Sequence, residues 1–218
     1  MSTLDLNSLA AELLAAFDQG RTIATLPSSR DAGFDLMAAY AVESELARLR
    51  WAGGRTTVGR KVGFANKAMW RILKLETLVW ARMYDDTVRY ATGNNASLSL
   101  ARRCAPRLEP EIVFRLKQTL EHGKADALSV LETVEWLALG FEINDCIFPD
   151  WKFQPADFVA AFGFHTALVI GEPRPVEPAM IPSLAGQLSR FKLTLLKDGR
   201  LAEEGSGRNS LRSPALCL

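Results

Sequence analysis

PRLEPEIVFRL, residues Pro106 to Leu116, combines the crowded apolar residues of a β-strand with two glutamates. Side chains alternate between the faces of a strand, so Glu109 and Glu111 leave the backbone on the same face. Pro110 lies between them and has no N–H to donate, which predicts an edge strand or a bulge. Two carboxylates on one face repel each other unless a positive charge lies between them. A divalent cation with oxygen ligands would supply that charge; a solvated pair opposed by lysine or arginine is the alternative.

A third acidic residue lies in an apolar stretch. Glu142 belongs to LALGFEI, residues 137–143, which otherwise suits a protein core. An unpaired buried carboxylate is costly or becomes protonated, so Glu142 needs a partner. That partner is either a lysine or arginine, or the cation held by Glu109 and Glu111. Three carboxylates completed by water suit Mg²⁺ or Mn²⁺ rather than Zn²⁺.

The composition limits the class of protein. The chain has 218 residues, which suits one large domain or one domain with a small accessory part. Its 26 basic and 25 acidic residues are interspersed, which argues against nucleic-acid binding. Three cysteines without a CxxC pair indicate a reducing compartment, and two histidines make a zinc site improbable. No long apolar run or secretory signal is evident, so we expect a cytoplasmic protein without a membrane span.

Helical spacing of apolar residues predicts two helices near the N-terminus. The first covers about Leu4 to Phe17 and ends at Gly20, and the second covers about Gly33 to Trp51. A third helix is predicted over 126–139, where apolar residues again recur at helical spacing.

Alternating patterns predict strands in the rest of the chain, over 56–63, 78–84, within 98–117 and over 140–148. Asp198-Gly199 between two alternating runs predicts a β-hairpin. Helices followed by a strand-rich remainder indicate the α+β class. The sequence has no GxGxxG or Walker-type loop, so a nucleotide cofactor is not indicated.

Two lysines are candidate bases or substrate clamps. Lys61 lies between Gly59 and Gly63, where a ligand can approach the backbone closely. A lysine in an apolar, cation-rich pocket has a lowered pKa and can take a proton near neutral pH. Lys67 lies at the start of a short helix that Asn66 could cap. The alternative for either lysine is a position on the solvated surface.

Two further candidates are less distinctive. Asp85 and Asp86 are adjacent, so on an extended backbone at most one points into a site, and a turn or capping role is the alternative. His165 lies among apolar residues in FGFHT, where a core histidine and a catalytic histidine are both possible.

Five stretches resemble one known family: GRKVGFANKAM (59–69), MYDDTV (83–88), PRLEPEIVFRL (106–116), FEIND (141–145) and PDWKF (149–153). Together they resemble the 2-keto-4-pentenoate hydratase group of the fumarylacetoacetate hydrolase superfamily, which also holds 2-oxohepta-3-ene-1,7-dioate hydratases and 2-oxo-3-hexenedioate decarboxylases. The resemblance runs from about residue 30 to the C-terminus. It implies a mixed β-roll with peripheral helices; we expect a helical region over 1–55 and the catalytic roll over 56–218, within one continuous domain.

The resemblance also implies a site and a reaction. Mg²⁺ or Mn²⁺ would be bound by Glu109, Glu111 and Glu142, with Lys61 and Asp86 in the active site. The substrate would be a small 2-keto or 2-hydroxydienoic acid from aromatic catabolism, and the leading interpretation is a hydro-lyase. Alternatives are a 2-keto acid decarboxylase, an acylpyruvate C–C hydrolase and a non-catalytic partner subunit. We expect a homo-oligomer.

Two stretches depart from that family pattern. AFGFH, residues 161–165, replaces a polar Asp-Asn-Ala-Ser-Ser-like segment. We therefore expect Phe162 and Phe164 to contact substrate together with Lys67, and His165 to act in catalysis, which favours a bulkier or less polar acid. The resemblance breaks off at Gly205, whereas relatives continue for a few dozen residues. A roll lacking its C-terminal closing segment, with exposed sheet edges, is expected.

Overall fold

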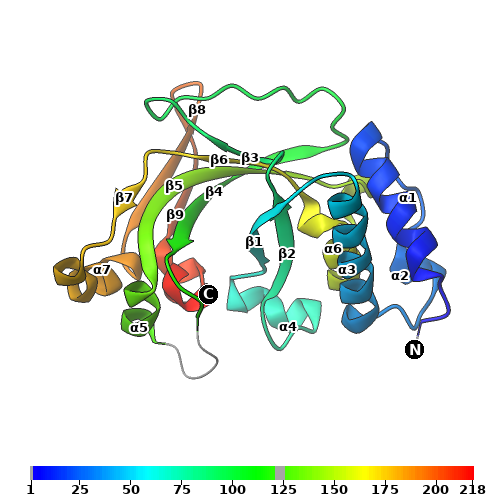
Figure 1. The fold of residues 1–218 in the computed structure, drawn as a ribbon, viewed down its shortest axis with the longest axis horizontal. Helices are drawn as coiled ribbons and strands as arrows, with labels where there is room; N and C mark the ends of the chain where they lie inside the picture. The colour runs from blue at the N-terminus through cyan, green and yellow to red at the C-terminus, as the bar shows by residue number, and fades with distance from the viewer. Residues whose placement is uncertain (1, 121–125) are drawn as a thin grey trace.

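The computed structural model describes residues 2–120 and 126–218 (Figure 1). Its N-terminal helices are α1 (Leu6–Gln19), α2 (Pro27–Arg30) and α3 (Leu36–Ala52). The Asp5 side chain accepts hydrogen bonds from the first turn of α1, and Gly20 ends that helix in the left-handed conformation with φ 62°. The two helices predicted near the N-terminus, and the glycine that ends the first, are confirmed.

The strands form three sheets in the described part of the chain. β1 (Thr57–Gly63) pairs antiparallel with β2 (Val79–Tyr84). The main sheet has the order β3-β6-β5-β4, and its strands are β3 (Val88–Tyr90), β4 (Pro106–Leu116), β5 (Val134–Asp145) and β6 (His165–Ile170), with β7 (Arg174–Pro175) also pairing with β5. β8 (Lys192–Lys197) and β9 (Arg200–Ser206) form a separate hairpin. The sheet is mixed, since β3 and β6 run parallel and the other pairs are antiparallel.

Short helices connect these strands: α4 (Trp70–Leu73), α5 (Ala127–Glu132), α6 (Pro155–Ala160) and α7 (Ile181–Leu188). Figure 1 shows the main sheet arching across the molecule, with α1 to α3 at one end and α5 and α7 at the other. The predicted α+β class is confirmed. None of the helices within the described ranges has both the length and the apolar character to cross a membrane.

Two local predictions depended on proline and glycine, and both are confirmed. β4 is the edge strand of the main sheet, as Pro110 indicates. Asp198 and Gly199 join β8 to β9 with φ of 52° and 74°, the left-handed conformations of a tight hairpin turn.

The helix predicted over 126–139 is confirmed only as far as Glu132, and its second half is wrong. Helix α5 ends at Glu132, and the chain continues as β5 from Val134. Pairing along the whole length of β4 favours the strand, because the register joins Leu116 to Val134 at one end and Pro106 to Asp145 at the other. Residues 98–105 carry no strand, so the strand-rich stretch predicted over 98–117 reduces to β4.

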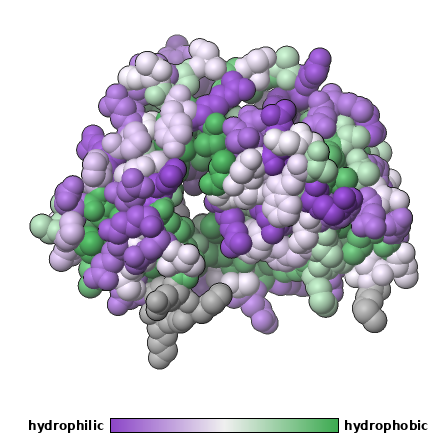
Figure 2. All heavy atoms as spheres, in the orientation of Figure 1, coloured by the Kyte–Doolittle hydropathy of each residue, from purple (hydrophilic) through white to green (hydrophobic). Residues whose placement is uncertain are grey.

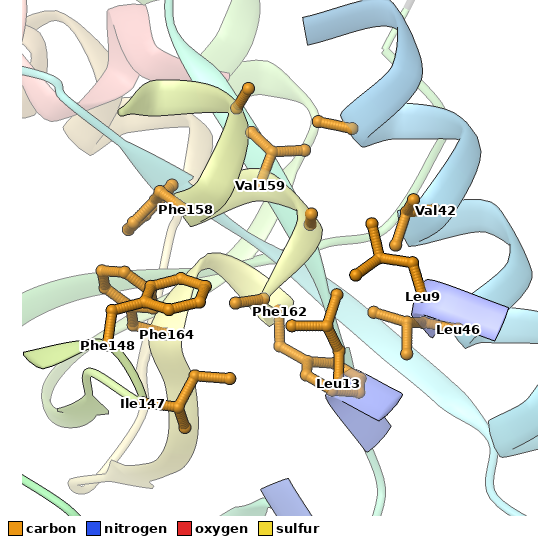
Figure 3. Close-up of a cluster of buried hydrophobic side chains, with 14 of the residues drawn as sticks. Leu9, Leu13, Val42, Leu46, Ile147, Phe148, Phe158, Val159, Phe162 and Phe164 are labelled. Atoms are coloured by element: carbon orange, nitrogen blue, oxygen red, sulfur yellow. The ribbon is translucent and has the colours of Figure 1, made fainter. Parts of the chain in front are cut away.

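One hydrophobic core joins the N-terminal helices to α6 (Figure 3). Leu13 and Leu46, from α1 and α3, are fully buried together with Val159 of α6. Phe162 and Phe164 follow α6 and belong to the same cluster. This packing fixes the segment that leads into β6, and it thereby fixes the position of His165. The division near residue 55 stays a prediction.

Candidate active site

Three carboxylates converge at the junction of β4 and β5. Glu109 lies directly opposite Glu142 in the register, and Glu111 lies opposite Gly140. Directly paired residues of neighbouring strands point to the same face, so all three side chains project together. Ligand oxygens of the three glutamates lie within 4.8 Å of one another. The convergence expected from the sequence is therefore present in the structure.

Glu142 is the most buried of the three, at 2% exposed. Its Oε2 lies 2.8 Å from Lys61 Nζ and accepts a hydrogen bond from Asn144 Nδ2 at 3.1 Å. Its Oε1 lies 2.7 Å from His165 Nδ1. Three of about four lone-pair positions of the carboxylate are thus occupied, and one remains for a further partner.

Lys61 reaches this cluster from β1, where it is buried. Besides Glu142, its ammonium donates to Asn144 Oδ1 at 2.9 Å and to the carbonyl of Gly163 at 3.1 Å. These acceptors match the three donors of a lysine ammonium. Nζ also lies 5.2 Å from the ring centre of Phe158. The surface interpretation of Lys61 is therefore wrong.

His165 links Glu142 to Thr87, the residue before β3. Its Nδ1 donates to the Glu142 carboxylate, which can only accept, and its Nε2 lies 2.9 Å from Thr87 Oγ1. The imidazole is 2% exposed and does not line the cavity described below. This geometry supports a positioning role for His165 toward Glu142, and its predicted catalytic role stays a prediction.

The cluster holds more acidic than basic side chains. Burial acts to raise the pKa of Glu142, but the charge of Lys61 and the hydrogen bond from His165 outweigh burial and lower this pKa to about 2. Burial, followed by the charge of Glu142, raises the pKa of Glu111 to about 8. Burial also raises the pKa of Glu109. Lys61 and His165 both contact Glu142 directly, so they compensate the charge of the other two carboxylates only in part.

This donor set fits a hard divalent cation. All three ligand groups are carboxylate oxygens, which Mg²⁺ and Ca²⁺ prefer at about 2.0 to 2.6 Å. Two oxygens bound to one ion can lie at most twice the metal–oxygen distance apart, which is about 4 Å for Mg²⁺ and about 5 Å for Ca²⁺. The ligand oxygens here lie within 4.8 Å of one another, so they fit around Ca²⁺ as they stand and need only a small approach to fit around Mg²⁺. Glu109, Glu111 and Glu142 would hold the ion, which would also offset the charge that raises the pKa of Glu111.

The structure separates two adjacent aspartates. Asp86 forms ion pairs with Arg50 and with Arg55, the latter at 3.3 Å. Asp85 instead lines the cavity, and its Oδ1 accepts a hydrogen bond from Thr56 N at 3.1 Å. The two side chains face apart as their adjacency predicted. The catalytic role given to Asp86 stays a prediction, and Asp85 is the aspartate on the cavity wall.

The predicted substrate contacts lie elsewhere. Phe164 is 1% exposed and packs against Phe153, with ring centres 4.7 Å apart, inside the helical core. Phe162 is likewise in that core and packs against Phe17. Lys67 is exposed, with Nζ 5.3 Å from the ring centre of Trp70. None of the three lines the cavity, so their substrate-binding role stays a prediction without a supporting contact.

A large open cavity of about 1210 Å³ borders Lys61, Glu111 and Glu142. Figure 2 shows a hollow through the middle of this face of the molecule, with hydrophobic side chains at its rim. Much of the cavity wall is apolar and comes from the main sheet and from β1. Substrate could therefore reach the carboxylates over an apolar surface.

Sequence reasoning missed two polar residues of the site. Asn144 lies two positions after Glu142, on the same face of β5, and bonds both Glu142 and Lys61. That spacing was a usable signal, because alternate residues of a strand share a face. Thr87 bonds His165 across 78 residues of sequence, and no local pattern indicates that contact.

Comparisons with known proteins place these residues in a family. A scan against protein-family models finds no match. The chain is 30% identical over 203 residues to 2-hydroxyhexa-2,4-dienoate hydratase of Comamonas testosteroni, covering 93% of this chain and 74% of that protein. It is 29% identical over 215 residues to 2-hydroxypent-2,4-dienoate hydratase of Pseudomonas putida, covering 98% of this chain and 92% of that protein.

Solved structures show the same fold. 4-Oxalocrotonate decarboxylase from Pseudomonas putida G7, complexed with magnesium and adipate, superposes with a TM-score of 0.82 at 20% identity and covers 96% of this chain and 76% of that chain. The complex of this decarboxylase with calcium and acetate gives a TM-score of 0.84 at 20% identity and the same coverage. The sequence identities and the shared fold agree with the family suggested by the sequence motifs. The chain belongs to the 2-keto-4-pentenoate hydratase group of the fumarylacetoacetate hydrolase superfamily.

Proposed function

We propose that this protein is a Mg²⁺-dependent hydratase that adds water to a small 2-hydroxydienoic acid of the kind released by aromatic ring cleavage. The observation that carries the proposal is the convergence of Glu109, Glu111 and Glu142 beside Lys61, next to an open cavity that Lys61, Glu111 and Glu142 line. Relatives at 30% and 29% identity are hydratases of six- and five-carbon 2-hydroxydienoates. Magnesium in the structure of a protein with the same fold supports the choice of ion.

The residues of the site suit this chemistry. A bound Mg²⁺ would act as a Lewis acid toward the substrate carboxylate and its 2-oxygen. Lys61 borders the cavity and can exchange a proton with a bound acid. In the first step the proton leaves the 2-hydroxyl and a proton reaches C5, which gives a conjugated 2-oxo-3-enoate. In the second step the oxygen of water bonds to C4, and a proton ends on C3.

Two neighbours keep these groups in place. His165 donates to Oε1 of Glu142, which leaves Oε2 for Lys61 and Asn144. Asn144 also accepts from Lys61 and therefore orients both members of the ion pair. Removing either neighbour is expected to misplace Glu142 rather than to remove a reacting group.

A decarboxylase is the second candidate, because specific relatives favour it. The chain is 30% identical over 165 residues to 4-oxalocrotonate decarboxylase of a Pseudomonas species, covering 76% of this chain and 60% of that protein. The solved structures with the same fold are also decarboxylases. The two reactions share the need for a cation beside a 2-oxo acid, so the carboxylate cluster alone does not separate them.

The proposal also covers the arrangement of the sheets and the oligomeric state. We propose that the main sheet and the β1–β2 and β8–β9 pairs together form the mixed β-roll, which the likeness to decarboxylases of this fold supports. We also propose a homo-oligomer, which light scattering on the purified protein would test directly.

A direct assay tests the function. The purified protein with Mg²⁺ is incubated with 2-hydroxypenta-2,4-dienoate, and the dienoate absorbance and released CO₂ are followed together. Hydration removes the dienoate absorbance without release of CO₂. In a parallel incubation with 4-oxalocrotonate, release of CO₂ would identify the decarboxylase. Chelation of the metal should stop turnover, and added Mg²⁺ should restore it. Failure to consume any dienoate, with metal binding intact, would contradict the hydratase assignment and favour the partner-subunit alternative.

A further inference from the structure

We propose that the site prefers monocarboxylic 2-oxo or 2-hydroxydienoic acids whose far end is an uncharged hydrocarbon group of several carbons. This inference rests on the proposed function, because it takes the carboxylate cluster as the place where the acid end binds. It concerns the other end of the substrate. The hydrocarbon would lie on an apolar wall on the inner face of the main sheet, defined by Val88, Val113, Trp136, Leu168 and Ile170.

The register of the main sheet places this wall next to the carboxylates. The row that contains Glu109 and Glu142 continues across the sheet to Leu168 and then to Val88. Paired residues share a face, and neighbouring strands lie about 4.8 Å apart. The apolar wall therefore begins one strand away from Glu142, on the face where the carboxylates project.

The next row extends the same wall. Glu111 pairs with Gly140, Gly140 pairs with Ile170, and Ile170 pairs with Tyr90. A Cβ atom at Gly140 would lie 2.9 Å from Val113 Cγ2 and 3.3 Å from Leu168 Cδ1. The side chains of Val113 and Leu168 thus close over the glycine, and they make the apolar surface continuous between the two rows.

The wall is preformed and partly accessible. Leu168 and Ile170 are each 4% exposed and form a small hydrophobic cluster with Val88, Val113 and Trp136 packed against it. Tyr90 is 57% exposed, and its ring meets that of Trp136 edge to face at 6.3 Å. All six side chains line the cavity.

Each of the three basic residues that line the described cavity already contacts another side chain. Lys61 is bound to Glu142, and Arg60 lies over the ring of Trp80 with its guanidinium carbon 4.3 Å from the centre. Arg115 approaches Glu135 at 3.6 Å. It also lies four residues beyond Glu111 along β4, which is about 13 Å at the rise of a strand. A second carboxylate on a six-carbon acid would therefore face apolar side chains, where an unpaired charge is unfavourable.

Binding of unreactive 2-oxo acids tests the inference without turnover. The Mg²⁺-loaded protein is titrated by calorimetry with 2-oxopentanoate, 2-oxooctanoate and 2-oxoadipate. Each buried methylene contributes about 0.8 kcal/mol, or about fourfold in affinity. We expect 2-oxooctanoate to bind at least about tenfold tighter than 2-oxopentanoate, and 2-oxoadipate to bind weakest. Equal affinities, tightest binding of 2-oxoadipate, or binding of none of the acids would overturn the proposal.

Variants locate the effect on the wall. Tyr90→Arg places a cation at the exposed end of the wall and should raise the affinity for 2-oxoadipate about tenfold or more while weakening 2-oxooctanoate. Tyr90→Phe is the matched control and should change neither affinity beyond about twofold. Arg115→Gln should leave 2-oxoadipate binding unchanged, and a loss there would show that Arg115 serves a second carboxylate after all. Circular dichroism and thermal unfolding of each variant establish that the fold is retained.

Failure of this inference and failure of the proposed function are distinguishable. Turnover of dienoates without any preference for chain length would remove the apolar subsite and keep the hydratase. A clear preference for 2-oxooctanoate without turnover of any dienoate would keep the subsite and remove the hydratase.

Discussion

Glu142 and Asp157 are both almost inaccessible to solvent, at 2% and 0% exposed, but their carboxylates have different partners. Asp157 lies in the packed helical region, where it accepts hydrogen bonds from Ser28 N at 2.8 Å, Ser28 Oγ at 2.6 Å and Gln154 N at 2.9 Å. Glu142 lies on the cavity side of the main sheet, where it meets Lys61 and His165 and lies close to two further carboxylates.

The difference lies in the balance of charge around each acid. Neutral donors from Ser28 in α2 and from Gln154 at the start of α6 satisfy Asp157, and the contact joins α2 to α6. The surroundings of Glu142 hold three carboxylates against two basic side chains, and they open on a cavity. Burial of an acid is therefore a poor indicator of function by itself, whereas an unbalanced cluster beside a cavity is a stronger one.

Lys61→Met should have the largest effect on activity. It removes the proton carrier, so kcat should fall on the order of 10³-fold, as for other general acid–base groups. Mg²⁺ affinity should stay within about tenfold, because the three carboxylates remain. Stopped-flow assays with a dienoate and calorimetric Mg²⁺ titrations measure the two quantities. Lys152→Met, on the exposed surface, is the matched control, and near-normal turnover of Lys61→Met would exclude Lys61 as the proton carrier.

Glu142→Gln should have the largest effect on the metal. The amide keeps the shape of the side chain but loses the negative charge, and Mg²⁺ affinity should fall about 100-fold or more. Lys61 would be left with an uncompensated charge, so the free energy of unfolding should also fall, by about 3 kcal/mol. Calorimetric Mg²⁺ titration and urea denaturation measure these changes. An unchanged affinity for Mg²⁺ would contradict the assignment of Glu142 as a ligand.

Local chemistry explains which parts of the site were predictable. The period of two in a strand places Glu109 and Glu111 on one face, and Pro110 requires an edge, so both features follow from neighbouring residues alone. The apolar context of Glu142 indicates that it needs a charged partner. All three carboxylates of the cluster could thus be named in advance.

Features that depend on distant segments could not be predicted. The pairing of Glu109 with Glu142 is set by the register of two strands separated by a helix, and that register also replaced the predicted helix over 133–139 with β5. Phe162, Gly163 and Phe164 have positive φ values of 58°, 57° and 58°, so the facing of their side chains does not follow from a regular period. Their rings turn into the helical core, and the apolar wall of the cavity comes from the sheet instead.

Asp157→Asn should separate the two buried acids most cleanly. The substitution weakens hydrogen bonds at the start of α6, and the free energy of unfolding should fall by about 1 to 3 kcal/mol. Mg²⁺ affinity and turnover should remain those of the unaltered protein, because the cavity side of the sheet is untouched. Ser28→Ala removes one of the same hydrogen bonds and should cost less, about 1 kcal/mol. A weaker affinity for Mg²⁺ in Asp157→Asn would break the distinction between the packed region and the cavity region.

Two cysteines extend the same comparison with a smaller effect. Burial raises the pKa of Cys146, in the packed region, to about 11. Burial, followed by the charge of Glu111, raises the pKa of Cys217, on the cavity wall, also to about 11. The thiolate is the reactive form, so its fraction and the alkylation rate of Cys217 should rise about tenfold from pH 8 to pH 9. Cys146 should stay unmodified until the protein unfolds, because it is 1% exposed.

A ligand in the cavity should slow the alkylation of Cys217 and leave the alkylation of Cys104 unchanged. With Mg²⁺ and 2-oxooctanoate bound, alkylation of Cys217 by iodoacetamide should slow several-fold, since the ligand fills space on the wall that this thiol lines. Peptide mass mapping distinguishes Cys217 from Cys104, which is also partly exposed and serves as the internal control because it does not line the cavity. If the ligand slows both thiols equally, the protection reflects a general stabilisation of the protein. If it slows neither, the acid does not occupy the part of the cavity next to Cys217, and the boundary between the packed and ligand-accessible regions lies elsewhere.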